Sequence, residues 1–220
     1  MLKSLKKKAL AILFSSLIFS SFAFANTAEK LALNKQGIKV WTIQAADNPM
    51  AQYRAETTFN TTLENAVGLI LDTERGSKWI PNVSQIQVIE RNDSTGSFIA
   101  YMVLKMPFPL TDRDLVIKGE MRKDAQGRII VTNKSVKDSR LPEKPGIVRI
   151  NQYEGDWIFQ KISEQSVKVT THGYADPSGA IPKGIVNTFV QQQPYQMFQK
   201  MKEQVKTIQY SAKDLPKSIQ

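Results

Sequence analysis

The chain contains no cysteine and only one histidine, His172, among its 220 residues. The absence of cysteine excludes disulfides, thiol catalysis, cysteine-ligated zinc and a lipid-modified bacterial N-terminus. A lone histidine without regularly spaced carboxylates is not a metal-ligand set, so we expect neither a metal nor a cofactor. Nucleophilic hydrolysis needs an activated nucleophile with a neighbouring base, and a chain without cysteine and with one histidine offers few such groups. The sequence therefore favours a binding protein over an enzyme.

Long apolar runs are also scarce, and the only one lies at the start of the chain. Lysines within residues 3–8 precede an apolar run from Ala9 to Phe19, and Ala23-Phe24-Ala25 supplies a small-x-small cleavage site. The run is shorter than the roughly 20 residues that a spanning helix needs. The pattern predicts a cleaved secretory signal peptide over residues 1–25 and, without cysteine, a protein released into a bacterial periplasm.

Acidic residues are fewer than basic ones, 20 against 30. Without the predicted signal peptide, 26 basic and 20 acidic residues remain, a formal net charge of +6. Export argues against a nucleic-acid partner, so an anionic membrane surface or ligand is expected. Much of the excess lies near the C-terminus, on Lys183, Lys200, Lys202, Lys206, Lys213 and Lys217. Ordinary solvation and matching of the helix dipole explain these lysines equally well.

No repeat, low-complexity tract or Gly/Ser linker divides the rest of the chain. The sequence therefore predicts one domain over residues 26–212 and a flexible tail over 213–220. Alternating patterns predict strands over 38–44, 52–59, 84–91, 97–106, 113–123, 128–137, 147–153, 156–162 and 166–174. Because short turns such as Glu154-Gly155 separate most of them, neighbouring strands should pair antiparallel in one large sheet.

Two helices are expected beside the strands. Thr61-Thr62-Leu63-Glu64 has the pattern of a capping box and predicts a helix that ends near Gly76. A longer helix should begin at Pro182 and continue to about Ile208. Pro194 inside it removes a backbone hydrogen bond and weakens the helix by roughly 3 kcal/mol. Such a weak point fits either a lid or a static bend along a curved sheet, and the sequence leaves both open.

One segment points to an internal cavity. Met106-Pro107-Phe108-Pro109-Leu110-Thr111-Asp112-Arg113-Asp114 leads into a strand on which Arg113 shares its face with Leu115 and Ile117. A guanidinium aimed at an apolar interior needs a carboxylate, a backbone carbonyl or the polar end of a ligand. The segment therefore favours a hollow interior over a filled core.

This segment, followed at the right spacing by Gly179-Ala180-Ile181-Pro182-Lys183-Gly184-Ile185-Val186-Asn187 and Pro194, resembles the START family, the StAR-related lipid transfer domains. The resemblance spans about residues 41–208. It implies an α+β helix-grip fold, in which a large curved antiparallel sheet wraps around the C-terminal helix and encloses one lipid-sized molecule. It also implies that Arg113 projects into the cavity. Asp112 and Asp114 match the flanking acids, and Asp114 is expected to cap or pair at the strand start.

Apolar, aromatic and sulfur-containing side chains are expected to line this cavity. The expected ligand-binding residues are Arg113, Asn187, Phe98, Met102, Met106, Ile117, Phe189, Met197 and Met201, with Trp79, Trp157 and Phe159 as further candidates. Asn187 would offer an amide from the closing helix, as the resemblance implies. Tyr101 lies on the other face of its strand from Met102 and is expected to be exterior.

The sequence thus predicts a monomeric periplasmic protein that binds or transfers one fatty acid, phospholipid or sterol-like molecule under its C-terminal helix. A cyclase or aromatase-like enzyme would use a similar cavity but would need His172 or Tyr174 inside it, and the strand pattern places His172 outside. A lipid-sensing module that signals to a protein partner is a third reading. An exposed apolar patch on the outer face of the sheet would favour this reading.

Overall fold

A computed structural model describes residues 28–44, 52–179 and 181–220, apart from the side chains of Ala28, Lys183 and Asn187. The predicted signal peptide and its cleavage site lie outside the described residues. Within the described ranges, no helix is both long enough and apolar enough to cross a membrane.

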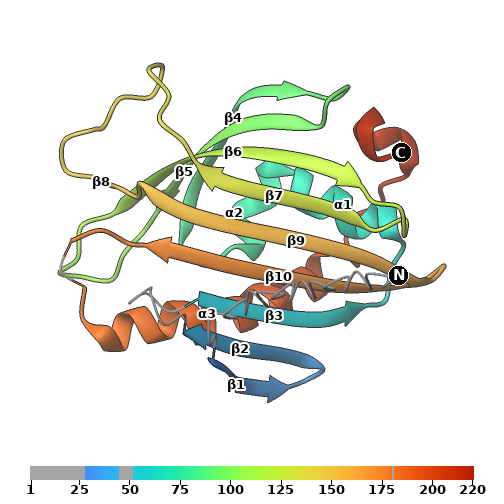
Figure 1. The fold of residues 1–220 in the computed structure, drawn as a ribbon, viewed down its shortest axis with the longest axis horizontal. Helices are drawn as coiled ribbons and strands as arrows, with labels where there is room; N and C mark the ends of the chain where they lie inside the picture. Colours follow the sequence, from blue (N-terminus) through green and yellow to red (C-terminus); the bar gives the residue numbers. More distant parts are fainter. Residues whose placement is uncertain (1–27, 45–51, 180) are drawn as a thin grey trace, which may run out of the picture.

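The strands of the described residues form one sheet (Figure 1). They are β1 (Ala28–Lys35), β2 (Ile38–Gln44), β3 (Gln52–Phe59), β4 (Val83–Asn92), β5 (Ser97–Leu104), β6 (Arg113–Lys123), β7 (Ile129–Ser135), β8 (Val148–Arg149), β9 (Gln152–Ser163) and β10 (Ser166–Asp176). The order is β1-β2-β3-β10-β9-β7-β6-β5-β4, with every neighbour antiparallel, and the short β8 pairs parallel to β6. Pairing of β3 with β10 joins the first strands of the chain to the last.

Helices cover one face of this sheet (Figure 1). They are α1 (Leu63–Leu71), α2 (Gly76–Trp79) and α3 (Lys183–Gln204), with 3-10 turns η1 (Thr73–Arg75), η2 (Ala212–Asp214) and η3 (Lys217–Ile219). The long helix α3 packs on β2 and β3 and against α2. The predicted α+β fold, a large antiparallel sheet with a long C-terminal helix against it, is confirmed.

The first helix begins as predicted but ends early. The Thr62 side chain accepts a hydrogen bond from the Asn65 backbone N–H at 3.2 Å, as an N-cap residue does. The helix stops at Leu71 instead of near Gly76, because Asp72 leaves helical geometry and its carboxylate caps the following turn by accepting from Arg75 N. The chain bends there and restarts as α2.

The filled part of the core lies under the C-terminal half of α3. The Phe198 ring meets the rings of Phe59 and Trp157 edge-on, with centroids 6.0 and 6.1 Å apart. Met201 and Phe159 are both fully buried within the same cluster. Pro194 is buried one turn before Phe198, within an unbroken helix. The C-terminal half of α3 therefore packs on a filled core, whereas its N-terminal half covers a cavity.

Tyr101 and the C-terminal tail are more buried than the sequence pattern indicates. Tyr101 is on the outer face of the sheet, as expected, but is 1% exposed, because the segment after β7 folds over that face and packs Val136 and Leu141 beside it. The tail, which was expected to be flexible, packs against the sheet: Leu215 and Ile219 are buried, and the Ser218 N–H donates to the Asp93 carbonyl at 3.3 Å. The apolar residues of the tail join the hydrophobic core, and η3 packs against β6.

The sequence pattern also misplaced one turn and missed one strand. β9 passes straight through Glu154 and Gly155, which were interpreted as a turn between two strands. Gly155 lies opposite Asn133 of β7 and Gly173 of β10, in the middle of the sheet. The strand β1 was not predicted at all, and its register with β2 shifts at a bulge between Leu31 and Leu33.

Candidate ligand cavity

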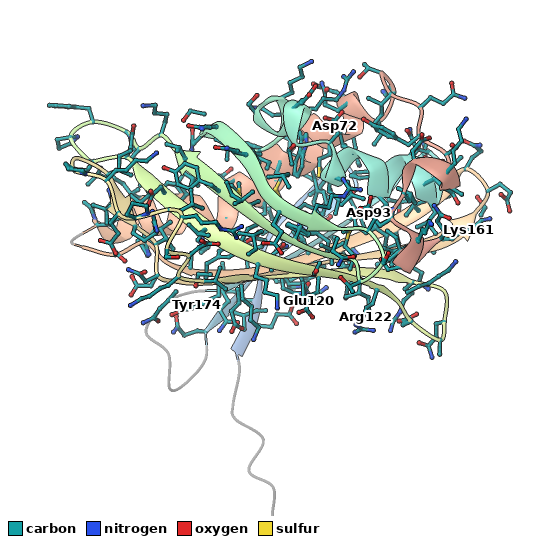
Figure 2. The ribbon with its side chains drawn as sticks, turned by 90° about the horizontal axis from the view of Figure 1, so that it is seen from above. Asp72, Asp93, Glu120, Arg122, Lys161 and Tyr174 are labelled. Atoms are coloured by element: carbon teal, nitrogen blue, oxygen red, sulfur yellow. The ribbon has the colours of Figure 1, made fainter. Side chains whose placement is uncertain are left out.

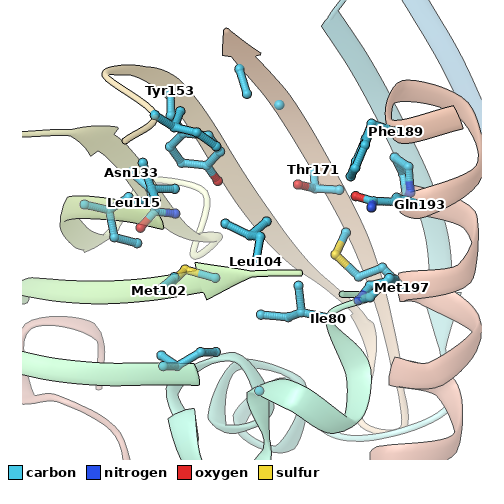
Figure 3. A pocket seen from close by; sticks show the side chains of 18 of the residues that line it. Ile80, Met102, Leu104, Leu115, Asn133, Tyr153, Thr171, Phe189, Gln193 and Met197 are labelled. Atoms are coloured by element: carbon cyan, nitrogen blue, oxygen red, sulfur yellow. The ribbon is translucent and has the colours of Figure 1, made fainter. Parts of the chain in front are cut away.

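A cavity of about 280 Å³ lies between the sheet and the helices (Figure 3). This volume is near the lower end of the range, about 300–1,000 Å³, that is typical of small-molecule sites. Its walls come from β3, β4, β5, β6, β7, β9 and β10, from α1 and α2, and mainly from the N-terminal half of α3. Most of the lining side chains are apolar, so the interior suits an apolar molecule.

Most of the predicted lining residues lie on this cavity. Those that line it are Phe98, Met102, Met106, Arg113, Ile117, Phe189 and Met197, together with Trp79 and Trp157. Met201 and Phe159 do not line it, because they belong to the filled core beneath the second half of α3. Asn187 is in α3, but its side chain lies outside the described part of the structure.

Arg113 is 4% exposed, and backbone carbonyls satisfy its guanidinium. Its Nε donates to the Pro177 carbonyl at 3.1 Å and its Nη2 to the Ser178 carbonyl at 3.0 Å, while Nη1 donates to the carbonyl of Thr111. Of the three acceptors that the sequence left open, the structure uses backbone carbonyls. Arg113 therefore fastens the loop before α3 to the start of β6, at the end of the cavity where Met106 lies.

The neighbouring Asp114 faces the other side of the sheet and is 1% exposed. Its two carboxylate oxygens accept hydrogen bonds from Arg149 at 2.6 and 2.9 Å, and one also accepts from the Tyr101 hydroxyl at 3.1 Å. Asp114 therefore pairs at the strand start, as expected. It stabilises β6 from the outer face of the sheet and does not line the cavity.

Polar groups inside the cavity come from residues that sequence reasoning did not select. Figure 3 shows Asn133, Tyr153, Thr171 and Gln193 pointing into it, and Tyr53 also lines it. Burial raises the pKa of Tyr53 to about 12 and raises the pKa of Tyr153 further. Both hydroxyls are therefore protonated donors near neutral pH. Alternation of β7 and β9 would have placed Asn133 and Tyr153 inside, had β9 been recognised as continuous.

Of the two candidate acid or base groups of the cyclase reading, His172 is not on the cavity, and Tyr174 is among its lining residues but directs its hydroxyl away from it. His172 Nδ1 is 2.7 Å from a carboxylate oxygen of Asp156, and both side chains are about one-third exposed. The Tyr174 hydroxyl donates to Gln152 at 3.2 Å, and Figure 2 shows Tyr174 at the outer surface of the sheet. The condition that the cyclase reading sets is therefore not met. Among the described residues, no group of three acidic or histidine side chains is placed to hold a metal ion.

Comparison with known proteins identifies the family to which the chain belongs. Residues 29–214 match the model of the START domain. The chain is similar to an uncharacterized protein of Pseudomonas aeruginosa, at 27% identity over 75% of this chain and 80% of that protein. It is also similar to the phosphatidylcholine transfer protein of Rattus norvegicus, at 23% identity over 72% of this chain and 74% of that protein.

A solved structure gives the same result. The crystal structure of a StAR-related lipid transfer protein fragment from Xanthomonas axonopodis superimposes with a TM-score of 0.73 at 26% identity, and the match covers 81% of this chain and 98% of that one. The resemblance noted from two short motifs is thus confirmed over nearly all of the described residues, and the chain belongs to the START domain family.

Proposed function

We propose that the protein binds one apolar or amphiphilic lipid in the cavity and carries it through the periplasm. The observation that supports this most is an apolar cavity of about 280 Å³ inside a START domain, closed by the N-terminal half of α3. The periplasmic location follows from the signal-peptide pattern of residues 1–25. A lipid carrier needs a shielded apolar interior, which this arrangement supplies.

The lipid-sensing alternative lacks a feature that would favour it. The large hydrophobic side chains that are exposed in the described residues are Leu31, Val88, Phe108 and Ile162. They are on β1, β4, the β5–β6 loop and β9, and β1 and β4 form opposite edges of the sheet. These residues therefore do not make one contiguous patch for a protein partner.

Filling the cavity tests the proposal directly. Met102 and Leu104 both point into the cavity from β5 (Figure 3). We expect Met102→Trp combined with Leu104→Trp to reduce the lipid that co-purifies with the protein at least tenfold, because the indole rings occupy the space of the ligand. The measurement is native mass spectrometry with lipid extraction. Ile162→Trp, at a position 58% exposed on β9, is the matched control and should keep the wild-type ligand content.

Two results would count against the proposal. Wild-type protein that is persistently empty and takes up no fatty acid, phospholipid or sterol analogue would remove the cavity as a lipid site. A filled variant that folds and still carries the same lipid would show that the lipid binds elsewhere.

We further propose that the loop between β5 and β6 touches the membrane during exchange. Phe108, at its tip, is 97% exposed between two prolines. A Lys105–Asp112 ion pair and a hydrogen bond from the Met106 N–H to Asp112 at 3.2 Å close the base of the loop. Aromatic side chains held in this way suit the membrane interface. Arg113 ties this loop to the loop before α3, and Figure 1 shows both at the same end of the sheet.

The lysines of the C-terminal region support such contact less well than Phe108 does. The Lys202 ammonium donates to the Gln36 carbonyl at 3.1 Å, and desolvation lowers its pKa. Lys200 is in the second half of α3, and Lys206, Lys213 and Lys217 come after the helix, so all four are on the far side of Pro194 from its start. The β5–β6 loop that carries Phe108, and not the region that carries these lysines, is the segment linked through Arg113 to the loop before α3.

Phe108→Ala is expected to lower binding to vesicles of phosphatidylcholine and phosphatidylglycerol by about tenfold. Burial of a phenyl side chain is worth about 1.5–3 kcal/mol, and about 1.4 kcal/mol corresponds to a factor of ten. Vesicle sedimentation measures the effect, and Ile162→Ala, which removes an exposed side chain near the β9–β10 turn, should leave binding unchanged. Equal binding by the Phe108 variant would exclude this loop as the contact.

A further inference from the structure

Three glycines lie in a single row of the strand register across the sheet, with Asn133 between the second and the third. The pairs Tyr53–Gly173, Gly173–Gly155, Gly155–Asn133, Asn133–Gly119 and Gly119–Phe98 run from β3 to β5. Residues in one such row share a face of the sheet, and here that face lines the cavity. Because the glycines present no side chain, neighbouring aromatic rings can lie directly over them.

The side chains of Tyr153 and Tyr53 lie over Gly155 and Gly173. A Cβ added at Gly155 would be 2.5 Å from the Tyr153 hydroxyl, and one added at Gly173 would be 2.6 Å from the Tyr53 hydroxyl. Each hydroxyl therefore takes the place of a missing side chain. Because Gly155 and Gly173 are direct partners, the two hydroxyls lie beside each other, and the presence of Tyr53 contributes to the raised pKa of Tyr153.

Asn133 completes the row on the next strand. It is 7% exposed, lies opposite Gly155, and its side-chain amide has no hydrogen-bond partner among the described residues. Opposed side chains in an antiparallel pair have Cβ atoms about 5 Å apart. The Tyr153 hydroxyl, which occupies the place of a Gly155 side chain, is therefore within reach of one small group that the Asn133 amide also contacts. An amide that faces a cavity without a protein partner is best satisfied by a ligand or water there.

The charges around the cavity decide which group this is. Arg113 donates to three carbonyls, and Asp72, at the rim, is paired with Arg75 and accepts from the Tyr210 hydroxyl. The glycine row itself carries no ionised side chain. A carboxylate or phosphate at the row would be buried without a counter-charge, which is strongly unfavourable. The Asn133 NH2 and the Tyr153 hydroxyl can each donate a hydrogen bond, so a neutral acceptor can be satisfied by both at once.

We propose that the glycine row, with Asn133 and Tyr153, is a polar subsite that recognises an uncharged carbonyl within the ligand, as in an acyl ester. The inference rests on the proposed function and narrows it to lipids whose buried part is neutral. The rest of the molecule contacts the apolar walls, and the carbonyl accepts from the Asn133 amide and from the Tyr153 hydroxyl.

Competition with one fluorescent apolar probe tests the subsite, using methyl laurate, laurate at pH 7 and an n-alkane of matched length. We expect wild-type protein to prefer the ester over both other compounds. Asn133→Leu keeps the size of the side chain and removes the amide. It should weaken ester binding about tenfold while alkane binding stays equal or becomes tighter. Tyr153→Phe removes only the hydroxyl and should lower ester affinity severalfold, which keeps the test open if the Asn133 variant folds poorly. Thr132→Leu, on the outer face of β7, is the matched control.

The outcomes separate this inference from the proposed function. Wild-type protein that binds the alkane as tightly as the ester, or an Asn133 variant with unchanged ester affinity, would overturn the subsite and leave lipid binding intact. Tighter binding of laurate than of the ester would likewise contradict a neutral carbonyl. Failure to bind any of the three compounds would overturn both proposals.

Discussion

Replacement of Asp114 with alanine is expected to lower the free energy of unfolding by about 3–5 kcal/mol, as removal of one partner from a buried ion pair typically does. The change leaves the Arg149 guanidinium, whose side chain is 7% exposed, without its anion. It also leaves the Tyr101 hydroxyl without its acceptor. Urea denaturation followed by tryptophan fluorescence measures the loss.

The matched control is Asp112→Ala, two residues earlier in the chain. Its partner Lys105 has a side chain that is 64% exposed, so solvent screens the pair and its loss should have a far smaller effect. A loss below about 1 kcal/mol for the Asp114 variant would show that water, or another donor and acceptor set, replaces the buried pair.

Replacement of Arg113 with methionine is the second large effect. We expect a loss of about 2–3 kcal/mol in unfolding free energy, because hydrogen bonds from a charged donor to buried carbonyls are among the stronger ones. The fold should persist, but the loop before α3 is no longer fastened to β6. We therefore expect faster hydrogen exchange over residues 181–193 and faster loss of bound lipid.

Arg113→Lys separates charge from geometry. An ammonium keeps the positive charge but lacks the planar fork that reaches three carbonyls at once, so this variant should lie between wild type and Arg113→Met. If Arg113 instead holds a charged head group, the lysine variant should retain such lipids, and the exchange rate before α3 should not change in either variant.

Much of the fold could be predicted because local patterns and the final structure agree. The inward parity of Arg113, Leu115 and Ile117, the Thr62 cap and the start of α3 after Pro182 each depend on neighbours along the chain. The same holds for most of the cavity lining, since alternation along β5 and β6 assigns side chains to faces without knowledge of strand order.

The parts that failed depend on contacts between distant segments. Gly155 was interpreted as a turn because glycine usually interrupts a strand, whereas here Tyr153 fills the space above it. Tyr101 faces outward by parity, yet a later segment covers it. Asn133 carries no local signal that its amide faces a cavity, and only the register across four strands shows the row that it completes.

Pro194 divides α3 into two parts that should differ in the free energy needed to open them locally. The residues after it, including Phe198 and Met201, are inseparable from the aromatic interior, so moving them amounts to global unfolding. Of the residues before it, Val186, Phe189, Val190 and Gln193 line the cavity. Evolution can therefore retune how quickly cargo is exchanged through substitutions at positions such as Phe189, without lowering the melting temperature of the whole domain.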